Sequence, residues 1–212
     1  MPSDLTDVTV ILDRSGSMEL CREEAQNGVN HFVEEQQKEP GECLFSLVQF
    51  DSEYEFVRKG VPIADVREFK LVPRGMTALL DAVGRAINET GERLAAMNED
   101  DRPGLVVFVI VTDGQENASH EFTKAQVKEM IERQQKDYQW QFTFLGANQD
   151  AFAEAGAIGI RAGATANFNA KCAQAGFDSA SVCLSGMRQM SALGKQVDCA
   201  YTEGQRGAML GR

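Results

Sequence analysis

Side chains that carry oxygen alternate in a short segment near the start of this sequence. Residues 8–12 form the apolar run VTVIL, and Asp13, Ser15 and Ser17 then occupy every second position. Either serine alone is explained by helix capping, a role in which serine is strongly preferred. One carboxylate together with two hydroxyls also offers three hard oxygen ligands to a divalent cation. A helix cap and a metal site are therefore the two competing interpretations of this segment.

Two other segments carry the same kind of side chain. The pair Asp113-Gly114 follows a second apolar run, Leu105 to Val111, and Thr77 ends a loop at residues 73–77 that precedes a helix pattern. Taken singly, Asp-Gly after a strand is typical of a turn, and Thr77 is explained as another helix cap. The three segments taken together favour a shared site over three unrelated turns and caps.

An α/β sheet would bring these segments to one place. Ligands in open α/β sheets bind beyond the carboxyl ends of the strands, above all where the strand order reverses. If the strands are ordered 3-2-1-4-5-6, the reversal lies between the strands that end at Asp13 and Asp113. The expected site is formed by five side chains, which are Asp13, Ser15, Ser17, Thr77 and Asp113.

The chemistry of these five side chains favours Mg²⁺, with Mn²⁺ as an alternative. Carboxylate and hydroxyl oxygens are hard ligands, whereas zinc prefers histidine and cysteine. Two carboxylates balance the charge of one divalent ion, and the hydroxyls add no charge. The bound metal would therefore stay electrophilic and would accept a further carboxylate from another molecule.

Strand-like and helix-like segments alternate along the chain, which predicts an α/β fold with a mostly parallel sheet. Unbroken apolar runs predict strands buried on both faces, and the alternating residues 53–56 predict an antiparallel edge strand. The expected strands cover residues 8–12, 44–50, 53–56, 105–111, 140–146 and 164–168. Apolar residues at steps of three and four predict helices over 18–33, 79–97, 123–131, 151–155 and 182–193.

Length and composition predict one globular domain at residues 1–193, followed by a tail at residues 194–212. The tail is polar and glycine-rich without a clear period, so we expect it to contribute little to the core. The chain has five cysteines, an odd number without paired spacing, and we expect all of them to be reduced thiols.

Charge and hydropathy argue against several partners. The formal net charge of -11 disfavours nucleic acid and anionic membranes, because both attract basic patches. No apolar run approaches the roughly 18 residues of a membrane span, and the segment MPSDLTDV lacks the pattern of a signal peptide. These observations predict a cytoplasmic protein, or a virion-associated one if the gene is viral.

Enzyme motifs are not found in the sequence. No glycine-rich run ends in Gly-Lys-Ser or Gly-Lys-Thr, and no serine has the G-x-S-x-G setting of a hydrolase. Haloacid-dehalogenase-like enzymes carry a second aspartate two residues after the first, where this chain has Ser15. His31 is expected to pack or to lie on the surface, and His120 follows the Asp113 loop near the expected metal without an orienting partner for acid-base chemistry. We therefore predict that the protein is not an enzyme. Arg14 is expected either to be solvated or to help hold an anionic partner.

The DRSGS segment at residues 13–17, Thr77, and the Asp-Gly pair at residues 113–114 resemble a known constellation in their order and approximate spacing. They are similar to the metal-ion-dependent adhesion site of von Willebrand factor type A domains. The resemblance extends from about residue 6 to residue 193, and it includes the expected edge hairpin and the stretch FLGAN at residues 144–148.

This resemblance implies a fold and a set of metal ligands. The implied fold is a Rossmann-like, doubly wound sheet in the order 3-2-1-4-5-6, with one antiparallel edge strand and helices on both faces. Ser15, Ser17 and Thr77 would bind the metal directly, and Asp13 and Asp113 would act mainly through water. A glutamate or aspartate of a partner protein would fill the open position of the metal.

The resemblance also implies a function, which is that of a protein-binding adaptor dependent on Mg²⁺. We expect a stand-alone intracellular domain of the bacterial or phage type, whose partner the sequence does not identify. A structural component of a larger particle, such as a virion or tail, is the alternative. A metal-dependent hydrolase is less favoured.

Overall fold

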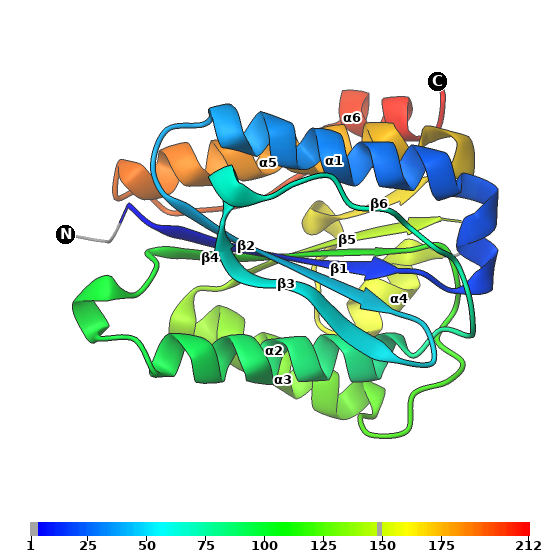
Figure 1. Ribbon diagram of the computed structural model, residues 1–212, viewed down its shortest axis with the longest axis horizontal. Helices are drawn as coiled ribbons and strands as arrows, with labels where there is room; N and C mark the ends of the chain where they lie inside the picture. Colours follow the sequence, from blue (N-terminus) through cyan, green and yellow to red (C-terminus); the bar gives the residue numbers. More distant parts are fainter. Residues whose placement is uncertain (1–3, 148–149) are drawn as a thin grey trace.

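In the computed structural model, which describes residues 4–147 and 150–212, a sheet of six strands lies between two layers of helices (Figure 1). The strand order is β3-β2-β1-β4-β5-β6. Strand β3 runs antiparallel to β2, and the other four pairings are parallel. This arrangement confirms the predicted α/β class, the Rossmann-like doubly wound sheet and the strand order 3-2-1-4-5-6.

The elements have the following bounds. The strands are β1 Thr6–Asp13, β2 Cys43–Phe50, β3 Tyr54–Pro62, β4 Leu105–Thr112, β5 Gln141–Ala147 and β6 Thr165–Phe168. The helices are α1 Arg22–Lys38, α2 Leu79–Ala95, α3 Lys124–Tyr138, α4 Ala151–Ala157, α5 Ala173–Ala192 and α6 Glu203–Met209. Short 3-10 turns include η1 Gly16–Cys21, η2 Ile63–Asp65 and η3 Glu99–Asp101.

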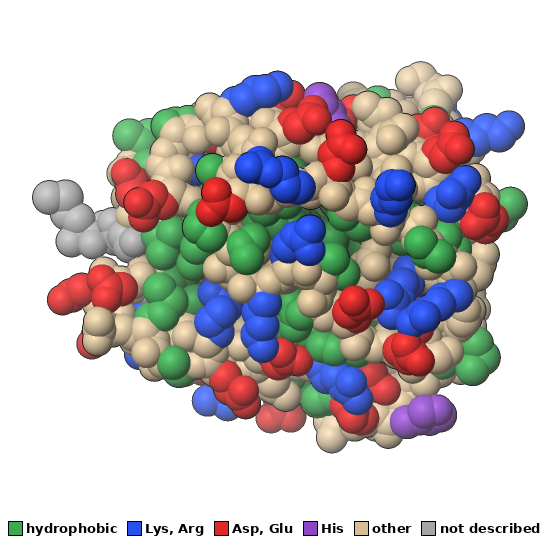
Figure 2. All heavy atoms as spheres, viewed as in Figure 1, with side chains coloured by type: hydrophobic (Ala, Val, Ile, Leu, Met, Phe, Trp, Pro, Cys, Tyr) green, Lys and Arg blue, Asp and Glu red, His purple; other side chains and the backbone are tan. Residues whose placement is uncertain are grey.

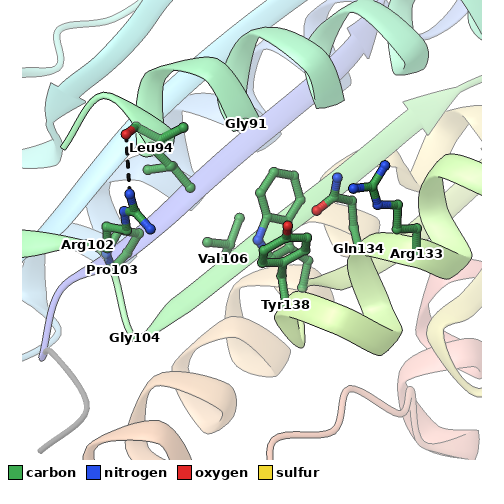
Figure 3. Close-up of a pocket in the computed structure, with 11 residues that line it drawn as sticks. Gly91, Leu94, Arg102, Pro103, Gly104, Val106, Arg133, Gln134 and Tyr138 are labelled. Carbon is green, nitrogen blue, oxygen red and sulfur yellow. Dashed lines mark hydrogen bonds between the residues drawn. The ribbon is translucent and has the colours of Figure 1, made fainter. Parts of the chain in front are cut away.

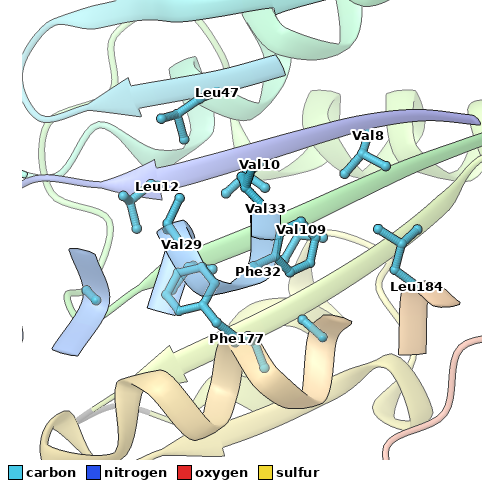
Figure 4. Close-up of a cluster of buried hydrophobic side chains, with 14 of the residues drawn as sticks. Val8, Val10, Leu12, Val29, Phe32, Val33, Leu47, Val109, Phe177 and Leu184 are labelled. Atoms are coloured by element: carbon cyan, nitrogen blue, oxygen red, sulfur yellow. The ribbon is translucent and has the colours of Figure 1, made fainter. Parts of the chain in front are cut away.

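Helices cover both faces of the sheet, with α1, α5 and α6 on one face and α2, α3 and α4 on the other (Figure 1). Val8, Val10 and Leu12 of β1 pack on the first face, in a cluster that includes Phe32 of α1 (Figure 4). Ile11, between them, packs on the second face. A central parallel strand is buried on both faces, which explains the unbroken apolar runs of β1 and β4.

Some element boundaries differ from the sequence expectation. Strand β3 continues to Pro62 rather than ending at residue 56, and its register against β2 is irregular around Leu47, which obscures the alternating pattern. Helix α5 begins at Ala173 rather than at residue 182. Its first half packs through small residues such as Gly176 and Ala180, which carry a weak hydrophobic signal. Asn148, part of the stretch 144–148, lies outside the described residues.

The cysteine prediction is wrong for two of the five residues. Cys183 of α5 and Cys199 form a disulfide with a Cα–Cα distance of 5.8 Å. No sequence pattern indicates this pair, because Cys199 reaches α5 only after the chain beyond residue 193 folds back on the domain. Cys21, Cys43 and Cys172 are free thiols, and the first two are buried.

The prediction that residues 194–212 contribute little to the core is also wrong. Tyr201 and Met209 are buried, and both belong to the cluster between the sheet and α1 and α5. Helix α6 begins with a capping box formed by Thr202 and Gln205, and Arg206 donates to backbone carbonyls, including that of Ala162 at 3.0 Å. Two large buried side chains in a polar segment give no periodic signal, so sequence patterns alone missed this packing.

Surface charge and hydropathy agree with the composition. On the face drawn in Figure 2, acidic side chains are interspersed with Lys and Arg rather than separated from them. Among the described residues, no helix is both long enough and apolar enough to cross a bilayer.

Met209→Ala tests the packing of the C-terminal segment. Met209 is 0% exposed, so its truncation leaves a cavity, and we expect the free energy of unfolding to fall by about 2–5 kcal/mol. Leu210→Ala is the matched control, because its neighbouring side chain is 39% exposed and should cost about 1 kcal/mol or less. Urea denaturation measures both variants. Equal losses would show that α6 is not packed as described.

Candidate metal centre

The carboxyl ends of two adjacent strands place both aspartates at one edge of the sheet. Strand β1 ends at Asp13, and Asp113 follows directly after β4, which pairs with β1 in parallel. Thr112, the last residue of β4, donates its hydroxyl to Asp13 Oδ2 at 2.6 Å. The backbone N–H of Ser15 donates to Asp13 Oδ1 at 2.6 Å. The two strand ends are therefore joined through the carboxylate of Asp13.

The serine hydroxyls extend this cluster to Asp113. Ser17 Oγ donates to Asp113 Oδ1 at 2.7 Å, and Ser15 Oγ lies 3.0 Å from Ser17 Oγ. Four of the five predicted side chains are thus linked by short contacts around one point. The alternation of acid and hydroxyls in the DRSGS segment is what points these oxygens to the same side.

Thr77 reaches the same point from a different loop. A Cβ atom built on Gly114 would lie 3.1 Å from Thr77 Oγ1, 3.5 Å from Ser17 Oγ and 3.9 Å from Asp13 Oδ2. The glycine therefore lies against oxygens from the other two segments. The structure brings all five predicted side chains together, and it shows why a residue without a side chain follows Asp113.

Helix capping does not account for the hydroxyls. Ser15 holds the N-cap position of η1, but its side chain makes no capping hydrogen bond. The N-cap of α2 is Ala78 rather than Thr77. Helix capping, which would best explain Ser15 or Thr77 taken alone, is thus not the role of either side chain.

Burial disfavours the ionised form of both carboxyl groups. Asp13 is fully buried, and this burial, opposed by hydrogen bonds from Thr112 and Ser15, raises its pKa to about 6; the charge of Asp113 adds to the increase. Burial also raises the pKa of Asp113. The Oδ2 atom of Asp113 is buried without a hydrogen-bond partner among the described residues. An unpartnered buried carboxylate oxygen is costly, and a bound cation would compensate it.

The composition of the cluster restricts the kind of metal that it fits. Within residues 4–147 and 150–212, no group of three or more His, Cys, Asp or Glu is arranged to hold an ion. A metal here would depend on hydroxyl oxygens besides its two carboxylates. This donor set suits a hard cation such as Mg²⁺ or Mn²⁺ and does not suit the nitrogen and sulfur preference of zinc.

Arg14, within the same segment, turns away from these oxygens. Its side chain is buried, with Nε donating to Asp51 Oδ2 at 3.0 Å and Nη1 donating to Glu55 Oε2 at 2.7 Å. The expectation that Arg14 is solvated is therefore wrong, because its guanidinium is buried and paired with two acids, whereas a role in holding an anionic partner stays a prediction. The edge hairpin supplies the acids that neutralise it, and no local pattern indicated that contact.

Asp51 is a supporting residue that the sequence analysis missed. Its Oδ2 atom accepts from Arg74 Nε at 2.8 Å as well as from Arg14, and its carbonyl accepts from Ala78 N at 2.9 Å. Burial would raise its pKa, but the hydrogen bonds from Arg74 and the Glu53 N–H, together with both arginine charges, hold the pKa below the ordinary value. In sequence, Asp51 reads only as a turn residue between two strands.

Backbone hydrogen bonds lock the two ligand loops together. Arg74 N donates to the carbonyl of Arg14 at 2.7 Å, and Gly16 N donates to the carbonyl of Gly75 at 3.2 Å. Gly75 has a φ of 68°, a left-handed conformation that glycine adopts without strain. The loop that carries Thr77 is therefore held directly against the loop that carries both serines.

Asn117 is a second missed residue, and it fixes Thr77 from the other side. Asn117 Oδ1 accepts from Thr77 N at 2.9 Å, and Asn117 N donates to Thr77 O at 3.0 Å. Nearby, Glu116 accepts from the backbone N–H of Leu80 at 2.9 Å, in the first turn of α2. The loop after Asp113 thus supports the Thr77 loop through Glu116 and Asn117, whose sequence context is that of an ordinary turn.

The fold of this chain is similar to that of several known structures. Von Willebrand factor type A from Catenulispora acidiphila is 16% identical, with a TM-score of 0.59, over 87% of this chain and 43% of that chain. Proximal thread matrix protein 1 from the mussel byssus, with a zinc-occupied MIDAS motif, is 16% identical, with a TM-score of 0.59, over 90% and 47%. Manganese-loaded TRAP protein of Plasmodium vivax is 13% identical, with a TM-score of 0.55, over 86% and 75%.

At these identities the likeness establishes a shared fold. The chain spans less than half the length of the first two of these structures. Among curated proteins, none matches the chain. The family model of the von Willebrand factor type A domain matches residues 7–176, which is most of the chain. The chain therefore belongs to the von Willebrand factor type A domain family.

Proposed function

We propose that this protein binds another protein through a single divalent metal ion held by Asp13, Ser15, Ser17, Thr77 and Asp113. The ion is Mg²⁺, with Mn²⁺ as the alternative, and a glutamate or aspartate of the partner completes its coordination. The observation that carries the proposal is the convergence of these oxygens on one point, with Asp113 Oδ2 buried and unpartnered there.

The five side chains would hold the ion in two different ways. The three hydroxyls are neutral ligands, and the two acids balance the ion's charge, mainly through bound water. Thr112 and the Ser15 N–H orient Asp13 by hydrogen bonds of 2.6 Å each. When bound, the metal supplies a Lewis-acidic position that is selective for a carboxylate.

Proteins of similar fold support the proposal that this chain binds a metal. The mussel protein is described with a zinc-occupied MIDAS motif and the Plasmodium vivax protein as manganese-loaded. Manganese is the alternative proposed here, and zinc differs from both proposed metals. Our preference for Mg²⁺ rests on the donor set of this chain, which is hard oxygen throughout.

Binding is favoured over catalysis by the surroundings of the cluster. Among the described residues, the hydrogen bonds that reach these side chains come from one another, from Thr112 and from backbone N–H groups. None of those partners is a histidine, cysteine or lysine able to act as a base or nucleophile. The net charge of -11 further favours a protein partner over nucleic acid.

A structural role in a larger assembly is the second candidate. It is favoured by the fold shared with a mussel protein named as a thread matrix protein. Metal-gated binding differs from static assembly in its response to EDTA, which releases a metal-bridged partner and leaves a metal-independent contact intact. A cytoplasmic location stays a prediction, and the Cys183–Cys199 disulfide does not support it, because such bonds are rare in the cytosol.

Mg²⁺ should stabilise the protein through Asp13. A ligand that binds only the folded state raises stability by RT ln(1 + [L]/Kd), so the melting temperature of the wild type should rise with added Mg²⁺. The increase should be much smaller in Asp13→Ala. Asp65→Ala, an exposed aspartate in η2, is the control and should respond like the wild type. The same Mg²⁺-dependent increase in Asp13→Ala and wild type would contradict the ligand assignment.

Thr77→Ala should abolish partner retention without unfolding the domain. The substitution removes one neutral ligand and changes no charge, and we expect binding to weaken by at least ~10-fold. Thr123→Ala is the matched control, because Thr123 caps α3 and its loss costs about 1 kcal/mol away from the site. Affinity capture in Mg²⁺ followed by EDTA elution and mass spectrometry measures retention. A folded Thr77→Ala that keeps the EDTA-released partner would exclude this mechanism.

The affinity for Mg²⁺ should fall in mildly acidic solution. Burial raises the pKa of Asp13 to about 6 in the metal-free protein, so its carboxyl group is largely protonated at lower pH. Mg²⁺ requires the carboxylate and must displace that proton, which weakens binding by about 10-fold for each pH unit below the pKa. Calorimetric titration at pH 7 and at pH 5 measures the change. Equal affinities at both pH values would show that Asp13 does not contribute its charge to the site.

A further inference from the structure

A pocket of about 410 Å³ opens at the edge of the sheet opposite to the metal centre (Figure 3). It lies where β4 begins, whereas Asp113 follows the end of the same strand. The last turns of α2 and α3 and the segment that leads into β4 form its walls. Its volume falls within the range of roughly 300–1,000 Å³ that is typical of sites for small molecules.

The interior of the pocket is apolar and rigid. Leu94 of α2, Val106 of β4 and Trp140 line it. Trp140 is only 6% exposed, and its ring stacks on Phe108 with centroids 5.5 Å apart and an angle of 14° between the planes. Tyr138, which is 59% exposed, stands at the mouth. One face of the indole is thus fixed by the core, and the indole also lines an open space.

A glycine in the middle of α2 keeps that space open. A Cβ atom on Gly91 would meet only Trp140, at an ordinary contact distance of 4.0 Å. Gly84 of the same helix differs, because its Cβ would lie 2.7 Å from the ring of Phe122. Glycine within a helix is destabilising relative to alanine. Packing requires Gly84 but not Gly91, and the missing side chain of Gly91 leaves open space beside the edge of the indole.

Two arginines line the mouth of the pocket, and the acidic turn η3 directly precedes the first of them. In Figure 3, Arg102 lies on one side and Arg133 on the other, with Val106 and Tyr138 between them. Arg102 donates to the carbonyl of Ala95 at 3.2 Å and forms no ion pair with any acid in the described part of the chain. Arg133 is 3.9 Å from Asp137, which is a loose contact on an exposed helix surface.

We propose that this pocket binds a small aromatic carboxylate, with its ring against Trp140 and its carboxylate at Arg102. A ligand ring in this space meets the edge of a rigid indole, and edge-to-face contacts of this kind favour an aromatic ring over an aliphatic chain. A guanidinium with unused donors favours a planar carboxylate, which it binds through two hydrogen bonds. This site is independent of the metal centre, and neither depends on the other being correct.

Tryptophan fluorescence provides a direct measurement, because Trp140 is the one tryptophan of the sequence. Phenylbutyrate is the probe, and phenylbutanol is its neutral counterpart of nearly the same shape. We expect phenylbutyrate to change the emission of Trp140 saturably, with phenylbutanol binding at least ~10-fold more weakly. A non-saturable response, or equal binding of the two probes, would overturn the proposal.

Two pairs of variants locate the binding. Gly91→Leu fills the pocket and should abolish the response, whereas Gly156→Leu, at an open position in α4, should leave it unchanged. Arg102→Gln should weaken phenylbutyrate binding by about 10-fold and leave phenylbutanol binding unchanged. Arg67→Gln removes the same charge from an exposed position near η2 and should have no effect. Circular dichroism establishes that each variant is folded. Wild-type binding by folded Arg102→Gln or Gly91→Leu would exclude this pocket as the site.

Discussion

Two carboxyl groups buried side by side impose the constraint around which the carboxyl edge of the sheet is built. Because β1 and β4 are adjacent and parallel, the topology itself brings Asp13 and Asp113 together. Burial raises the pKa of both, and the charge of Asp113 adds to the increase at Asp13. Donation from Ser17 and Thr112 relieves part of the cost. The divalent cation that we propose would compensate what remains, and the arrangement is hard to account for as core packing alone.

A second layer of contacts holds the ligands in place before any metal arrives. Asp51 binds Arg14 and Arg74, so it joins the hairpin to both ligand loops, and Asn117 holds Thr77 from the far side. Buried ion pairs of this kind are weak evidence of stability, because desolvation offsets much of their attraction. Here these contacts fix the positions of the two loops. Loops fixed in advance lose little freedom when an ion binds, which strengthens binding.

The sequence predicted both the fold and the five candidate ligands, because the patterns that indicate them are local. Strands β1 and β4 are buried on both faces and read as apolar runs, and the ligands follow strands or precede a helix. The supporting residues lack such signals. Asp51 meets Arg14 across 37 positions of sequence, and Met209 is buried from a polar segment that shows no period. Contacts of this kind are set by where the chain returns, which depends on the tertiary structure and is invisible to a local pattern.

The distribution of positive charge leaves the acidic cluster free to bind the cation that we propose. Arg14 lies within the ligand segment itself, and a guanidinium aimed at the cluster would compete with the metal. The structure instead buries it against Asp51 and Glu55, where its charge is balanced. Arg102 and Arg133 lie at the other end of β4, too far along the strand to neutralise the cluster. Among the described residues, no arginine or lysine forms an ion pair with Asp13 or Asp113, which is the condition that the proposed divalent ion requires.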